Sequence, residues 1–123
     1  MTYQHIDVDR IPDLADELAM DVTACLRFVD DFLDAWETRR ARVLHGVDSV
    51  VVDDALAALL TLATSSAMVG ATTLSSAAKE LHAESRQLGT VPRGGADRLA
   101  LIGAASCDEL RQASHHWRAS LVA

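Results

Sequence analysis

Aromatic residues make up only 4% of this 123-residue chain, which also has just two prolines and six glycines. Half of the residues are hydrophobic, so the apolar side chains are mostly those of alanine, leucine and valine. This mixture favours helices and argues against a β-sandwich or a disordered chain. The length is that of one domain and suffices for a core that needs no metal or disulfide. We therefore expect a single helical domain over residues 1–123.

Positive charge is also scarce, because 11 Lys and Arg residues stand against 18 Asp and Glu residues, for a net charge of -7. This balance repels nucleic-acid phosphates and anionic lipid. No apolar run approaches the ~18 residues of a membrane span, and Met1 to His5 lack the basic and apolar regions of a secretory signal. We expect a soluble cytoplasmic protein that binds neither nucleic acid nor membrane.

Cysteine is rare as well, and Cys25 and Cys107 match no C-x-x-C motif. Both lie in apolar periodic stretches, so we expect small buried side chains in a reducing compartment. The chain has no motif typical of a nucleophile elbow, a nucleotide phosphate loop, a zinc protease or a dinucleotide site. We therefore predict no cofactor, no metal and no enzymatic activity.

Apolar residues recur at helical spacing along most of the chain. They predict a short helix over residues 9–18 and long helices over 21–44, 50–69, 74–88 and about 96–120. Gly46, Gly70 and Gly89 interrupt the pattern between these segments, and we expect the stretch from Gly89 to Gly95 to be the longest loop. Four long helices with short connections predict an antiparallel four-helix bundle.

The 50–69 segment has two apolar stripes. At about 100° per residue, Leu60 points about 140° away from the stripe that we expect to face the core. This second stripe is either covered by another helix or exposed as a docking patch, and periodicity leaves both interpretations open. The stripe expected to face the core consists of Ala55, Leu59, Leu62, Ser66 and Val69.

A motif, TLATSSAMVGA, occupies residues 61–71 and is followed by Leu74 and Leu81. It resembles the third helix of the histidine-containing phosphotransfer (HPt) domain of bacterial phosphorelays, which carries a pattern like H-T-L-K-G/S-S-x-A-x-x-G-A. Phe32-Leu33 falls where that family often has Phe-Leu. The resemblance covers roughly residues 9–89 and implies a four-helix bundle in two-component signalling, with a receiver domain or a histidine kinase as partner. The positions that match in register are Thr61, Leu62, Ser65, Ala67, Gly70 and Ala71.

The family's phosphoacceptor is missing from this motif. Leu60 stands ten residues before Gly70, where the family has its histidine, and Ala63 stands where a lysine usually helps to hold the phosphoryl group. His82 follows Leu81 where the family often has a glutamate. A leucine has no nucleophilic nitrogen and cannot carry phosphate. The resemblance implies that a receiver domain docks on this outward side of the helix, so the expected binding residues are Leu56, Leu60, Ala63, Thr64 and Ala67.

Two other functions remain open. Another histidine, above all His82, could accept phosphate, which would make the chain an active phosphotransfer protein. The bundle could instead self-associate through the second apolar stripe without any link to signalling, so we expect a monomer or a weak dimer. Two further clusters suggest no chemistry. His115 and His116 point about 100° apart and cannot chelate one metal as an i, i+4 pair, and the carboxylates of residues 30–37 are followed by arginines that can pair with them.

Overall fold

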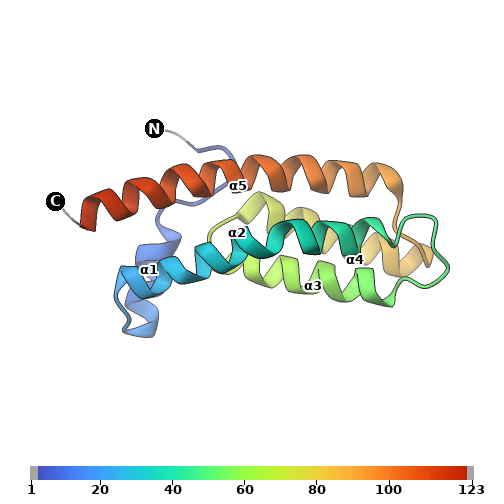
Figure 1. Ribbon diagram of the computed structural model, residues 1–123. Coiled ribbons are helices and arrows are strands. Elements are labelled where there is room, and N and C mark those ends of the chain that lie inside the picture. Colours follow the sequence, from blue (N-terminus) through green and yellow to red (C-terminus); the bar gives the residue numbers. More distant parts are fainter. Residues whose placement is uncertain (1–2, 122–123) are drawn as a thin grey trace.

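The computed structural model describes residues 3–121, which form helices and no named strand (Figure 1). The all-helical class is confirmed. Cys25 and Cys107 are buried and unpaired with each other, as predicted. Within residues 3–121, no helix is long and apolar enough to cross a membrane. The five helices are α1 (Arg10–Leu18), α2 (Val22–Leu44), α3 (Asp53–Met68), α4 (Thr72–Leu88) and α5 (Arg93–Leu121).

The helices pack around one core in a bundle-like arrangement. Helices α2 and α4 each contact both α3 and α5, and the short helix α1 packs against α2 and α3. In Figure 1, α1 lies at the end of the bundle where α5 finishes. Among the described residues, no Cα atom of α3 lies within 8 Å of a Cα atom of α5, so these two helices are not adjacent in the fold.

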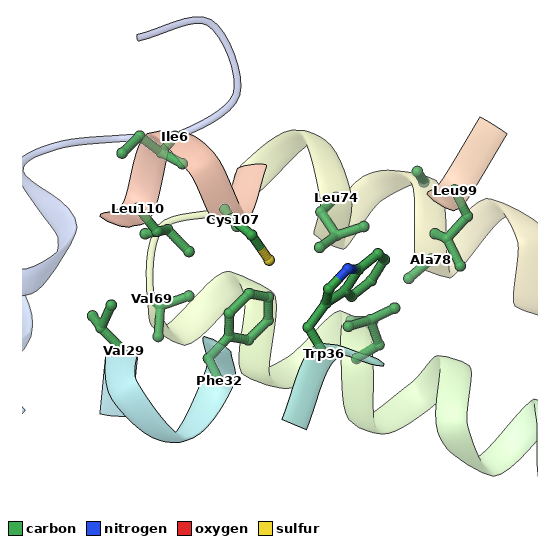
Figure 2. Close-up of a cluster of buried hydrophobic side chains, with 14 of the residues drawn as sticks. Ile6, Val29, Phe32, Trp36, Val69, Leu74, Ala78, Leu99, Cys107 and Leu110 are labelled. Atoms are coloured by element: carbon green, nitrogen blue, oxygen red, sulfur yellow. The ribbon is translucent and has the colours of Figure 1, made fainter. Parts of the chain in front are cut away.

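The core is built from the apolar stripes that periodicity predicts. Figure 2 shows Phe32 and Trp36 of α2 pointing into the same interior as Leu74 of α4 and Leu99 of α5, and all four side chains are buried. Gly103 of α5 makes room for Trp36, because a Cβ atom placed there would lie only 1.8 Å from the indole ring. The aromatic ring therefore packs directly against the backbone of α5.

Two connections differ from the prediction. Helix α5 begins at Arg93, so Gly94 and Gly95 lie in its first turn, and the expected long loop from Gly89 to Gly95 is wrong. Helix α3 begins at Asp53 rather than Val50, so the stretch from residue 45 to 52 separates α2 from α3. The connection between α2 and α3 packs against the connection between α4 and α5, where the Val91 backbone N–H donates to the Gly46 carbonyl at 3.0 Å. This tertiary contact holds both connections out of the neighbouring helices.

The segment before α1 is held against the bundle. The His5 backbone N–H donates to Glu109 Oε1 of α5 at 2.9 Å, and the His5 ring also bonds to the Glu109 carboxylate. The Asp7 backbone N–H donates to the Gly70 carbonyl at 2.8 Å, and Ile6 between them is buried. These long-range bonds were not foreseen from the sequence, which showed only a polar lead into α1.

Candidate docking surface on α3

Helix α3 presents an exposed strip without charge over its last three turns. Leu60 lies in the middle of this strip with 53% of its surface exposed, and Met68 is 36% exposed at its end. Charged residues make up 24% of the chain, so three solvent-facing turns without one are notable. An exposed leucine within an uncharged strip indicates an interaction surface more strongly than an exposed leucine surrounded by charged residues does. We define the α3 strip as Ala57, Leu60, Thr61, Thr64, Ala67 and Met68, all of them exposed.

The structure places four of the five expected binding residues at or beside this strip. Leu60, Thr64 and Ala67 are exposed, and Leu56 is half-buried at its edge. Ala63 is buried, with 4% exposure, and its carbonyl accepts a hydrogen bond of 2.8 Å from Ser75 Oγ of α4. The expectation that Ala63 belongs to the surface is therefore wrong, because this residue faces α4.

Sequence reasoning missed other residues of the surface. Thr61 and Met68 join Leu60, Thr64 and Ser65 in lining a shallow hollow of about 390 Å³. Thr61 is one of the motif positions, but it was not among the expected binding residues. Its position about 100° around the helix from Leu60 and about 120° from the core stripe already marks it as solvent-facing.

Two hydroxyl groups near Leu60, those of Thr64 and Ser65, are engaged by the helix itself. Thr64 Oγ1 donates to the Leu60 carbonyl at 3.1 Å, and Ser65 Oγ donates to the Thr61 carbonyl at 2.7 Å. These bonds hold the two side chains in fixed orientations and use their protons. A nucleophilic hydroxyl needs a neighbouring base to take its proton, and neither group has such a base as its acceptor. Neither of these two hydroxyl groups is therefore arranged as an activated nucleophile.

One cation lies at the rim of the strip. Arg39 of α2 donates from Nη1 to Ser65 Oγ at 3.0 Å and is half-buried. Its neighbour Arg42 pairs with Asp54 at 2.7 Å, and this bond lowers the pKa of Asp54 below its ordinary value. Arg39, in contrast, forms no ion pair with any residue in the 3–121 range. The positive charge of Arg39 is therefore available to an anionic group that approaches the strip.

The histidines of the chain lie elsewhere. His82 is half-buried on α4, and His115 and His116 are exposed near the end of α5. The latter two line, together with Tyr3 and Trp117, a hollow of about 620 Å³ between the N-terminal segment and α5. Among residues 3–121, no group of three or more His, Cys, Asp or Glu side chains is arranged to hold a metal ion.

Comparison with known proteins does not extend the resemblance seen in the motif. No protein-family model matches the chain, and no curated protein or solved structure matches it either. The similarity to HPt domains therefore depends on the motif residues, and the geometry of the α3 strip is the independent basis for a function.

Proposed function

We propose that this chain is an HPt-like signalling module that has lost its phosphoacceptor and acts by binding a receiver domain or a histidine kinase through the α3 strip. In this proposal the four long helices form the antiparallel bundle of that family. The observation that carries it is the exposure of Leu60, 53% of whose surface is open to solvent. The position ten residues before Gly70, which carries the histidine in the family, thus faces outward with a hydrocarbon side chain.

Leu60 would anchor the contact by hydrophobic burial. Full burial of a leucine contributes about 1.5 to 3 kcal/mol, so covering its exposed half would contribute about 1 kcal/mol. The rest of the strip is uncharged, so a partner can cover it without the cost of removing ions from water. A central apolar side chain surrounded by neutral contacts is the arrangement in which a few residues carry most of the binding energy.

Arg39 would add an electrostatic contribution at the edge of the contact. The resemblance implies a partner that carries a phosphorylatable aspartate, which is anionic with or without its phosphate. A guanidinium that forms no ion pair within residues 3–121 can form charge-assisted hydrogen bonds with such a group. Opposite charges across an interface also steer the encounter and increase the association rate. Binding would then weaken as the salt concentration increases.

The expected consequence of this binding is competition rather than relay. A receiver domain covered by the α3 strip is not accessible to a true phosphotransfer protein that uses the same surface. Because Leu60 cannot accept a phosphoryl group, the complex would hold the receiver without changing its phosphorylation state. The module would therefore inhibit a phosphorelay in proportion to its concentration.

The test is a binding titration with purified receiver domains and histidine kinases encoded by the same genome. Leu60→Asp places a charge at the centre of the contact and should reduce the affinity at least about tenfold. Leu88→Asp is the matched control, because Leu88 is 58% exposed on α4 and lies outside the strip. Circular dichroism of both variants checks that the helices are retained.

Two outcomes would contradict the proposal. Equal affinities of the parent protein and Leu60→Asp would remove the docking surface from α3. Incubation with a phosphorylated receiver provides the second test, because acid-labile phosphate on His82 or another histidine would show an active phosphotransfer protein. We expect no phosphate on the chain after such incubation.

A further inference from the structure

The hollow between the N-terminal segment and the last turns of α5 has the size of a small-molecule site. Its volume is about 620 Å³, and it shares no lining residue with the hollow beside the α3 strip. Sites for small molecules usually measure about 300 to 1,000 Å³. Figure 1 shows the N-terminal segment beside α5, with α1 at the same end of the bundle. Ala113 and Ala119 of α5 help to leave this space open, because each contributes only a methyl group to its lining.

The wall formed by the N-terminal segment is tied to the rest of the fold. The His5 backbone N–H donates to Glu109 of α5 at 2.9 Å, and the Asp7 backbone N–H donates to the connection between α3 and α4 at 2.8 Å. Tyr3 and Asp9, which line the hollow, stand on either side of these two bonds in the sequence. A wall that is already in place lowers the ordering cost of binding.

Two of the chain's few aromatic side chains line this hollow. They are Tyr3, the only tyrosine, and Trp117, one of two tryptophans. Both are half-buried, whereas Phe32 and Trp36 are buried in the core. The face of an aromatic ring attracts cations through its quadrupole, and tryptophan does so most strongly. The hollow therefore offers apolar surface that also favours positive charge.

The charges around the hollow favour a cation as well. Asp9 lines it and forms no ion pair with any residue in the 3–121 range. Arg10, Arg111 and Arg118, each next in sequence to a lining residue, pair with other carboxylates at 3.0, 3.2 and 2.7 Å. Residues 7–21 hold six carboxylates and one arginine, a net charge of -5 within a chain of -7. These carboxylates belong to Asp7, Asp9, Asp13, Asp16, Glu17 and Asp21.

We propose that this hollow binds an organic cation, a protonated or quaternary amine that carries an apolar group. The cationic nitrogen lies against the rings of Trp117 and Tyr3 and near the Asp9 carboxylate, and the apolar group covers the alanine methyl groups of α5. His115 and His116 also line the hollow, and a neutral imidazole accepts a hydrogen bond from an ammonium N–H. An anionic ligand would meet the charge of Asp9 and the negative potential of residues 7–21. The proposal does not depend on the function assigned to the α3 strip.

Fluorine NMR of the full chain labelled with fluorotryptophan tests the proposal, because the sequence has only two tryptophans. The probes are benzyltrimethylammonium, benzyl alcohol and benzenesulfonate, which share a ring and differ in charge. At about pH 7.5, where histidine is mostly neutral, the cation should shift the Trp117 signal to saturation. The signal of Trp36, which is buried in the core, should stay in place and report an intact fold. Benzyl alcohol and benzenesulfonate should each bind at least about tenfold more weakly than the cation.

Two variants locate the interaction without removing the Trp117 signal. Asp9→Asn should weaken binding of benzyltrimethylammonium about fivefold. Its matched control is Asp13→Asn, which removes the same charge from an exposed position of α1 outside the hollow and should bind within about twofold of the parent protein. Tyr3→Leu keeps an apolar side chain but loses the ring, so it should also weaken binding about fivefold.

Three outcomes would overturn the proposal. The first is a Trp117 signal that does not respond to the cation up to about 20 mM, a concentration beyond any specific affinity. The second is equal affinity for benzyl alcohol or benzenesulfonate, which would show that the hollow does not select positive charge. The third is an Asp9→Asn variant that binds the cation as tightly as Asp13→Asn does.

Discussion

Replacing Gly103 by alanine probes the packing between α2 and α5 at its closest point. The new methyl group would lie 1.8, 2.1 and 2.6 Å from three atoms of the Trp36 ring. Carbon atoms in contact are normally separated by about 3.5 to 4.0 Å. The indole must therefore move by about 2 Å, although it is 97% buried, since its exposure is only 3%. A ring packed in a protein interior moves this far only if its neighbours also shift.

The expected destabilisation follows from two opposing contributions. Alanine improves the intrinsic stability of an interior helix position by about 1 kcal/mol relative to glycine. Overpacking of a filled core costs about 1 to 3 kcal/mol, and a displacement of about 2 Å places this site at the upper end. The net loss in the free energy of unfolding should be about 2 kcal/mol. For a domain of this size, such a loss lowers Tm by about 8 °C.

Urea unfolding followed by circular dichroism and by tryptophan fluorescence measures this loss. Gly94→Ala is the matched control in the same helix, because a Cβ atom there meets nothing within 4 Å. The control should be equally stable or more stable than the parent protein by up to about 1 kcal/mol. Adding Trp36→Leu to Gly103→Ala should cost less than the sum of the two single changes. If Gly103→Ala and Gly94→Ala have the same stability, the packing of Trp36 against α5 is refuted.

Two further predictions concern titratable groups, one buried and one half-buried. Burial raises the pKa of the Cys107 thiol to about 11, so a thiol reagent at neutral pH should label the native protein far more slowly than the urea-unfolded chain, and equal rates would contradict this. Although burial acts in the opposite direction, the hydrogen bonds from His5 hold the pKa of Glu109 below its ordinary value of 4.5. A carboxylate with a lowered pKa contributes stability that is present above about pH 4.5 and is lost as the pH falls through the folded-state value. Glu109→Gln should therefore lower the urea midpoint at neutral pH and flatten its decrease in acid, whereas an unchanged acid profile would exclude this role.

The helices were predictable because their apolar spacing is strong and local. The exceptions lie where a tertiary contact decides the outcome. Gly94 and Gly95 form part of α5 although adjacent glycines usually indicate a loop. Gly95 lies close to Leu81 of α4, with 2.5 Å between its ideal Cβ position and Leu81 Cδ1, so a larger residue would disturb the contact between the helices. Sequence periodicity contains no information about this neighbour.

In the candidate surface, too, some features follow from local spacing and others depend on tertiary contacts. Helix geometry places Leu60 away from the core stripe but leaves open whether another helix covers it, and its 53% exposure decides for the exposed interpretation. Ala63 was assigned to the same stripe, but it lies only about 80° from the centre of the core stripe, whereas Thr64 lies about 180° from it. The family motif directed attention to Ala63 because it replaces a lysine. The place of Arg39 at the rim of the strip could not be predicted from local spacing, because its bond to Ser65 joins positions 26 residues apart.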